Sequence, residues 1–283
     1  MDISGKISPD LVEVYRRVSV AAAALGVKYV VVGAAARDLV LHYGYGAPVV
    51  RATIDVDFGI RVADAATYEE LRRRLEEDGF RATRTAHRLR SKAGTVLDII
   101  PFGPIARLDG HVLLPPDETH AFNVSGFEEA CATAEMVTLQ VDPEVTVPVA
   151  SPVGLALLKL IAWTDREAGA RRKDAADLGY LLENYEKIPA VEDALYGELQ
   201  DVLEAYGWDR SLGGAHLLGR AVSAIGLAPS KGIVSDLFND RIEGRPLESL
   251  EYEMCRNDFA ASELERVSRL LRAFRDGFVG GRL

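Results

Sequence analysis

Residues 27–38 have the sequence VKYVVVGAAARD. The β-branched run before Gly33 is typical of a buried strand, and Ala34 to Tyr43 is predicted to form a helix that ends at Gly44 and Gly46. At such a junction, free backbone N–H groups and the positive end of the helix can face an anion. Gly33 would let the backbone approach a phosphate closely, although a tight turn explains a glycine here equally well.

The rest of the first half alternates strand and helix signals. Residues 53–58 alternate polar and apolar, which is the period of a strand, and Thr67 to Asp78 is an amphipathic helix that Gly79 ends. Residues 84–92 and 95–100 are two strand-like segments separated by a short hairpin signal. Residues 101–150 contain six prolines with short strand-like runs between them, which is typical of the irregular far edge of a sheet.

The pattern changes at Ser151, which is an N-cap followed by Pro152 at the first helical position. We therefore expect an α/β (α+β) domain with a mixed sheet at residues 1–150 and an α-helical domain at residues 151–283. The helices predicted in the second domain are residues 151–163, 171–185, 191–206, 213–226 and 260–278.

Two aspartates lie in the predicted strand of residues 53–58. Side chains at i and i+2 of a strand share a face, roughly 6–7 Å apart along the chain, so Asp55 and Asp57 point the same way. Two such carboxylates repel each other unless a cation lies between them. Because Mg²⁺ takes one or two carboxylates together with substrate phosphates, the pair is a candidate metal site. The alternative is two solvated carboxylates on an edge strand.

A third acid, Asp98, interrupts the apolar run of residues 96–100. A buried carboxylate needs a partner. If a neighbouring strand aligns Asp98 with Asp55 and Asp57, the three carboxylates can hold two divalent ions, which stabilise the attacking and leaving oxygens of a phosphoryl displacement. The alternative is a structural carboxylate bonded to the backbone or to an arginine.

Short motifs follow one another in a specific order. They are VGAAARD at residues 32–38, RATIDVD at 51–57, VLD at 96–98, LALLKLIAW at 155–163 and RRKDAADL at 171–178. In this order they resemble the DNA-polymerase-β-like nucleotidyltransferase superfamily, and within it the predicted nucleotidyltransferases related to the AbiEii toxin group. The resemblance covers roughly residues 27–182.

The resemblance implies a nucleotidyltransferase-type mixed sheet with flanking helices. It assigns Asp55 and Asp57 to metal binding, with Mg²⁺ or Mn²⁺ as the cofactor. Asp98 is the third acid and metal ligand, which in such enzymes helps to activate the acceptor hydroxyl. We therefore expect these three aspartates to be catalytic.

The same resemblance places Gly33, Ala34 and Arg37 in the turn that holds the nucleotide phosphates. The family usually has Gly-Ser or Gly-Gly there, whereas this chain has Ala34. Because Ala34 supplies no hydroxyl, the backbone N–H groups alone would hold the triphosphate.

Lys159 and Asp174 complete the set of expected site residues. Lys159 matches a family lysine near the nucleotide phosphates and is the only charged residue between Ser151 and Trp163. The alternative is a side chain that extends to the helix surface. Asp174 and Asp177 share one helix face and have either an active-site role or a surface pairing with neighbouring basic residues. Those neighbours are Arg171, Arg172 and Lys173.

A basic row is the last candidate feature. Arg84, Arg88, Arg90 and Lys92 would share one face of a strand. The row is either a track for nucleotide phosphates or an RNA acceptor, or a solvated face that pairs with the acids of residues 76–78.

Composition limits the remaining possibilities. The net charge of −10 argues against nucleic-acid binding through overall charge, so any polyanion site must be local. Cys131 and Cys255 lie far apart, the histidines lack zinc spacing, and no signal peptide or membrane span is evident. We expect a cytoplasmic protein that does not contact a membrane.

The expected function is metal-dependent transfer of a nucleoside monophosphate from a nucleoside triphosphate (NTP) to an acceptor hydroxyl, with release of pyrophosphate. The acceptor would be RNA or tRNA, a protein or a small molecule. The alternative is a non-catalytic nucleotide-binding or interaction module, or a toxin component of a toxin–antitoxin pair, on the same fold. Ala34 motivates the non-catalytic alternative.

Overall fold

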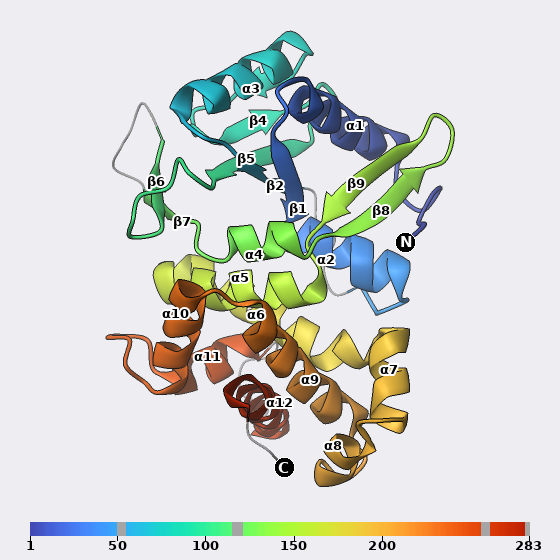
Figure 1. Ribbon diagram of the computed structural model, residues 1–283, viewed down its shortest axis with the longest axis vertical. Helices are drawn as coiled ribbons and strands as arrows, with labels where there is room; N and C mark the ends of the chain where they lie inside the picture. Colours follow the sequence, from blue (N-terminus) through green and yellow to red (C-terminus); the bar gives the residue numbers. More distant parts are fainter. Residues whose placement is uncertain (50–54, 115–120, 256–260, 281–283) are drawn as a thin grey trace. The chain divides into compact units, whose positions relative to one another are not determined.

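The computed structural model describes residues 1–49, 55–114, 121–255 and 261–280. The chain divides into two compact units, which are Met1–Gly44 with Pro48–Ser151, and Tyr45–Ala47 with Pro152–Leu283 (Figure 1). The first unit is a mixed α/β structure and the second is helical. The expected fold class is therefore confirmed.

The first unit is built on a seven-stranded mixed sheet with the strand order β3-β4-β5-β2-β1-β9-β8. The pairs β2–β5 and β1–β9 are parallel, and the other neighbours are antiparallel. A separate two-stranded sheet joins β6 (His111–Leu113) and β7 (Ala121–Asn123). The strands of the large sheet are β1 (Lys28–Val32), β2 (Val56–Arg61), β3 (Arg81–Ala82), β4 (Arg88–Arg90), β5 (Val96–Phe102), β8 (Glu135–Gln140) and β9 (Val145–Val149).

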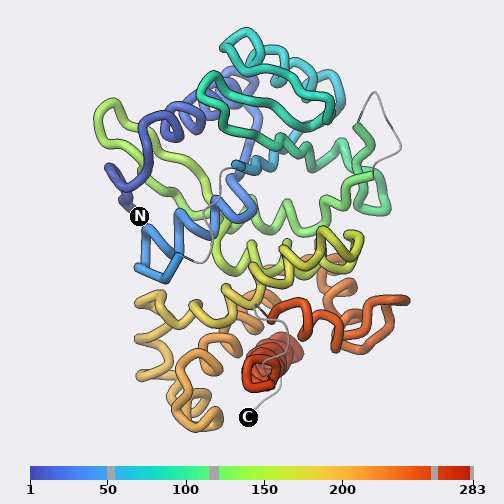
Figure 2. Tube along the Cα trace, turned by 180° about the vertical axis from the view of Figure 1, so that it is seen from behind, coloured from blue at the N-terminus to red at the C-terminus, as the bar shows by residue number. Residues whose placement is uncertain are grey.

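Helices cover both faces of this sheet (Figures 1 and 2). On one face, α1 (Pro9–Ala24) and α3 (Ala65–Glu77) pack side by side, and Tyr15 of α1 meets Phe58 of β2 with ring centroids 5.7 Å apart. On the other face, Phe127 of α4 (Phe127–Ala132) lies against Phe102 of β5. Because side chains alternate along a strand, Asp57 belongs to the α4 face of β2, opposite to Phe58.

The order of elements around residues 27–44 follows the sequence prediction. Strand β1 ends at Val32, and the chain turns at Gly33 into α2 (Gly33–Arg37), which continues as a π-helical turn (Asp38–Gly44). The predicted hairpin also exists, because β4 and β5 pair antiparallel around Gly94, whose φ is +94°. Residues 50–54, including the start of the strand expected at 53–58, lie outside the described residues.

Two expectations for the first unit change in detail. The short strand-like runs expected among the prolines are present as β6 to β9, and β8 is an edge strand of the large sheet, but residues 135–149 form a regular hairpin in which β9 pairs with the central strand β1. Pro143 lies in the turn and Pro148 in β9, so proline density here marks a turn and a strand position without excluding strands. The strand expected over 84–92 shortens to Arg88–Arg90, and Arg84 lies in a bend.

The second unit is a bundle of helices that surrounds α6. The expected helices at 151–163, 171–185, 213–226 and 260–278 are confirmed within a few residues. The helix expected at 191–206 is wrong, because a turn at Gly197 divides it. The helices are α5 (Pro152–Asp165), α6 (Ala168–Asn184), a 3₁₀ turn (Tyr185–Lys187), α7 (Pro189–Tyr196), α8 (Gln200–Ala205), α9 (Arg210–Ile225), α10 (Ala228–Phe238), α11 (Leu247–Met254) and α12 (Ala261–Val279).

Glycines allow α9 and α12 to pack with their backbones in contact. A Cβ atom at Gly219 would lie 2.0 Å from the carbonyl oxygen of Phe274, and one at Gly277 would lie 2.0 Å from that of His216. Only glycine permits such an approach. The apolar side of α12 is buried there, with Val267, Leu271 and Phe278 among its core residues.

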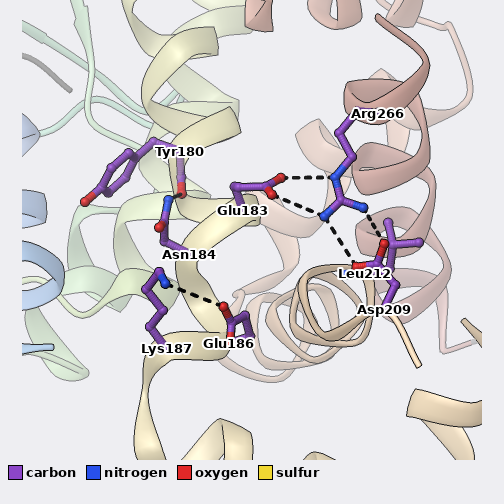
Figure 3. Close-up of polar contacts among 8 residues, drawn as sticks. All are labelled: Tyr180, Glu183, Asn184, Glu186, Lys187, Asp209, Leu212 and Arg266. Carbon is purple, nitrogen blue, oxygen red and sulfur yellow. Dashed lines mark hydrogen bonds and ion pairs between the residues drawn. The ribbon is translucent and has the colours of Figure 1, made fainter. Parts of the chain in front are cut away.

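One arginine ties three helices of the second unit together (Figure 3). Arg266 of α12 donates to Glu183 near the end of α6 and to Asp209, the N-cap of α9. Asp209 in turn accepts from the backbone N–H of Leu212 at 3.1 Å. The same carboxylate thus caps α9 and fixes α12, which gives this side of the bundle a polar anchor.

No helix within the described ranges is long and apolar enough to cross a membrane.

Candidate active site

The turn at Gly33 presses its backbone against Asp57. Gly33 has a φ of +71°, and a Cβ atom added to it would lie 1.9 Å from Oδ2 of Asp57. The β1–β2 register explains this contact, because Val32 and Asp57 are directly paired. The glycine that begins α2 and the second aspartate of the motif therefore form one structural element.

Asp57 and Asp98 lie side by side. Strands β2 and β5 are parallel neighbours, and Asp57 pairs with Asp98 in their register. Paired residues point to the same face of a sheet, so the alignment of these two carboxylates that the sequence predicts is present. Asp57 is half-buried and Asp98 is 9% exposed.

Asp55 differs from its partner in the motif. It lies just before β2, which begins at Val56, and its side chain is exposed. The argument that Asp55 and Asp57 share a strand face therefore does not fix its direction. Its part in the site stays a prediction.

Both carboxylate oxygens of Asp98 accept hydrogen bonds from Arg88. The guanidinium Nε and one terminal nitrogen each lie 2.7 Å from one oxygen, and the β4–β5 register pairs the two residues directly. The Nε2 atom of His87 is 3.9 Å from Oδ1 of Asp98. The alternative in which an arginine satisfies Asp98 thus describes this geometry, and its role as third acid stays a prediction.

The carboxylates suit a divalent ion whose ligands come partly from a nucleotide. Among the residues described, no group of three or more His, Cys, Asp or Glu side chains is arranged to hold a metal. Mg²⁺ is bound in proteins by one or two carboxylates plus substrate phosphates. The pair Asp57 and Asp98, next to the backbone of Gly33, fits this donor set, while a preassembled three-carboxylate site is not seen.

Residues at the start of α2 are mostly buried. Ala34 is 8% exposed and Arg37 is 5% exposed. Arg37 donates to Asp38 through Nε at 2.8 Å and Nη2 at 2.6 Å. Because this carboxylate already balances its charge, the expected phosphate contact of Arg37 stays a prediction, as does the role of Ala34.

Tyr15 of α1, which packs on Phe58 of β2, was not singled out by the sequence analysis. Its ring is fully buried, and its hydroxyl has no hydrogen-bond partner within the described part of the chain. Burial raises the pKa of Tyr15, and the charges of Asp57 and Asp38 raise it further. The phenol therefore stays protonated beside the acidic site.

Lys159 belongs to a buried ion network in the second unit. Its Nζ lies 2.9 Å from Asp174 and 2.7 Å from Asp177, and Asp174 also accepts from Arg166 at 2.8 Å. Burial lowers the pKa of Lys159, but the two carboxylates more than offset this, so its pKa is raised. The surface location considered for Asp174 and Asp177 is wrong, because both are buried.

A second buried contact adjoins this network and was not foreseen. Glu253 of α11 accepts from the indole Nε1 of Trp163 and from Arg171, whose guanidinium carbon lies 5.1 Å from the centroid of the Trp163 ring system. Arg171 thus pairs with α11 instead of Asp174. Its partner lies 82 residues away in sequence, so local spacing could not reveal it.

The four-residue basic row is not a continuous strand face. Arg88 and Arg90 share β4, but Arg84 and Lys92 lie in the flanking bend and turn. The acids at 76–78 that were considered as its partners instead pair with Arg72, Arg73 and Arg17. Of the predicted row, only two residues share strand β4: Arg88, which binds Asp98, and Arg90, which is exposed.

Structural comparison places the chain beside two solved proteins. It aligns with the crystal structure of an antigenic nucleotidyltransferase-like protein from Paracoccidioides brasiliensis at 19% identity and a TM-score of 0.36, covering 71% of this chain and 92% of that one. It also aligns with the antibiotic-resistance factor ANT(2'')-Ia at 14% identity and a TM-score of 0.36, covering 71% and 99%. No curated protein matches the sequence.

Sequence comparison identifies the family. The family model described as nucleotidyl transferase AbiEii toxin, type IV toxin–antitoxin (TA) system, matches residues 18–278, which is most of the chain. The match spans the Gly33 turn, the aligned aspartates and the Lys159 network. The chain therefore belongs to the AbiEii nucleotidyl transferase toxin family.

Proposed function

We propose that the protein transfers a nucleoside monophosphate from an NTP to an acceptor hydroxyl and releases pyrophosphate. The observation that carries this proposal is the alignment of Asp57 with Asp98 on adjacent parallel strands, against the backbone of Gly33. Family membership supports the same reaction type.

The chain's residues would act mainly by positioning and by charge. Gly33 leaves room for Asp57 at the end of β1, where α2 begins. Backbone N–H groups at such a junction can bind phosphate oxygens without a side-chain hydroxyl, which is the contribution we assign to Gly33 and Ala34. Mg²⁺ or Mn²⁺, when bound by Asp57 together with Asp55 or Asp98, would neutralise charge on the phosphates. Positioning and charge neutralisation supply most of the catalysis in phosphoryl-type transfer.

A direct assay tests this proposal. The full chain is incubated with each of the four NTPs, labelled at the α-phosphate, with Mg²⁺ or Mn²⁺ and with tRNA, total RNA, protein or small hydroxyl acceptors. We expect label on one acceptor class and an equal amount of pyrophosphate. Absence of both products with every acceptor would overturn the proposal. NTP binding without pyrophosphate release would favour the non-catalytic alternative that Ala34 motivates.

A role as the toxin of a toxin–antitoxin pair is a second proposal, favoured by the description of the family. It predicts that expression of the chain arrests growth and that a cognate antitoxin restores it. If arrest depends on transfer, Asp57→Ala also restores growth. Growth that is unaffected by the wild-type chain would contradict the toxin role and leave the transferase assay as an independent test.

A further inference from the structure

Arg88 is the arginine that contacts Asp98 in the candidate active site. Its guanidinium donates two hydrogen bonds of 2.7 Å to Asp98. The side chain of Arg88 is 37% exposed and that of Asp98 is 13% exposed. Two parallel N–H···O contacts between arginine and a carboxylate form a strong and directional pair. The acidic site is thus closed on one side by a positive group that still reaches solvent.

The charge of Arg88 acts on more than Asp98. The hydrogen bonds that Arg88 donates to Asp98 are the main cause that raises the pKa of Arg88, and the charges of Asp55 and Asp57 raise it as well. All three predicted acids therefore lie within electrostatic range of one guanidinium. Because carboxylates on neighbouring strands repel each other unless a cation lies among them, Arg88 offsets that repulsion in the chain alone.

We propose that Arg88 is a positioning residue that serves as the internal counter-ion of the acidic site: it holds Asp98 while no metal is bound, and a divalent ion that takes Asp98 as a ligand must first displace it. This inference rests on the proposed function only in placing the metal at these aspartates. It concerns how the site accepts its metal and does not depend on the acceptor.

The surroundings of Arg88 permit such a displacement. Strand β4 has three residues, and its outer neighbour β3 has two, so the guanidinium stands near the edge of the sheet. The backbone pairing of Arg88 with Asp98 keeps the side chain close after it leaves the carboxylate. A metal and a guanidinium therefore compete for the same two oxygens.

Manganese binding without nucleotide tests the proposal. Free Mn²⁺ is measured by electron paramagnetic resonance during titration of the full chain, wild type and Arg88→Gln. We expect Arg88→Gln to bind Mn²⁺ about fivefold more tightly, because a partly exposed ion pair of this kind contributes about 1 kcal/mol. The rise in melting temperature caused by Mn²⁺ should also be larger for this variant than for the wild type.

Arg90 provides a matched control. It lies two residues along β4, is exposed, and forms no ion pair within the described residues. Arg90→Gln removes the same charge and should leave the Mn²⁺ affinity near that of the wild type. Arg88→Lys keeps the charge but loses the two-pronged contact, so its affinity should lie between those of the wild type and Arg88→Gln.

A double variant identifies the carboxylate that is involved. In an Asp98→Asn background, Arg88→Gln should give a much smaller gain in affinity, because the ligand for which metal and guanidinium compete is gone. Unchanged or weaker Mn²⁺ binding by a folded Arg88→Gln chain would overturn the proposal, and so would an equal gain in Arg90→Gln. If the gain appears but no transfer is found, the counter-ion role stands and the proposed function fails. If transfer is found but Arg88→Gln does not bind Mn²⁺ more tightly, the proposed function stands and the counter-ion role fails.

Discussion

Replacement of Gly33 by alanine tests the link between the β1–α2 turn and Asp57. Two effects add in this variant. An L-residue at a φ of +71° is disfavoured by roughly 1–2 kcal/mol. The new Cβ would also lie 1.9 Å from Oδ2 and 2.9 Å from Cγ of Asp57, so the carboxylate must move. Overpacking of this kind costs roughly 1–3 kcal/mol, and the total destabilisation should be about 2–5 kcal/mol.

Gly26 separates the two effects. It has a φ of +63°, but a Cβ there meets nothing within 4 Å. Gly26→Ala should therefore lower the free energy of unfolding by only about 1–2 kcal/mol. In an Asp57→Ala background, most of the excess cost of Gly33→Ala over Gly26→Ala should disappear, because the clashing carboxylate is absent and only the contact with Cβ of residue 57, at 3.2 Å, remains.

Urea unfolding followed by far-UV circular dichroism measures these free energies. Tryptophan fluorescence is unsuitable, since Trp163 and Trp208 both belong to the second unit. Equal destabilisation by Gly33→Ala and Gly26→Ala would contradict a clash with Asp57, and so would an excess cost of Gly33→Ala that persists in full in the Asp57→Ala background. Loss of transfer in Gly33→Ala should accompany the excess cost.

Three further predictions concern other parts of the structure. Gly219→Ala should destabilise the bundle by about 2 kcal/mol or more, since its Cβ would lie 2.0 Å from a backbone carbonyl oxygen of α12. Gly232→Ala, on the open face of α10, should instead stabilise the protein by up to about 1 kcal/mol. Thermal unfolding of the two variants measures the difference. Hydrogen bonds from Arg16 lower the pKa of Glu13 to about 2 from its usual 4.5. The stability that Glu13 contributes is therefore present above pH 4.5 and is lost as the pH falls toward 2. Glu13→Gln should make the free energy of unfolding depend less on pH between these two values. Lys159→Met should destabilise by about 3–5 kcal/mol in urea unfolding, because two buried carboxylates lose their shared partner.

Local patterns were sufficient for the elements near the site. The VVVG run, the DVD alternation and the acid in VLDII were enough to predict strands there and to single out Asp57 and Asp98, but their alignment was only a condition until the β2–β5 register showed it. Helix α1 was missed, although Ser8 followed by Pro9 is the same N-cap signal that correctly predicted the start of α5.

Contacts between distant segments could not be predicted in the same way. Parity suggested that Arg88 and Arg90 face a common side, but only the β4–β5 register shows that Arg88 meets Asp98. Likewise, Lys159 was correctly singled out as an isolated charge in an apolar helix, while its pairing with both Asp174 and Asp177 depends on how α5 packs on α6. Which charged residues form ion pairs depends on how the elements pack, and a single sequence shows only which residues could take part.

We propose that the carboxylate of Asp57 is required for nucleotidyl transfer. The most direct measurement is the single-turnover rate of transfer from an α-labelled NTP in the presence of Mg²⁺, for the wild type, Asp57→Asn and Glu69→Gln. Glu69 is an exposed acid on α3 with no ion pair among the described residues, so it controls for the loss of one charge. We predict that Asp57→Asn slows transfer about a hundredfold or more with an unchanged circular dichroism spectrum, and that Glu69→Gln keeps the wild-type rate. Transfer by Asp57→Asn at the wild-type rate would contradict the account.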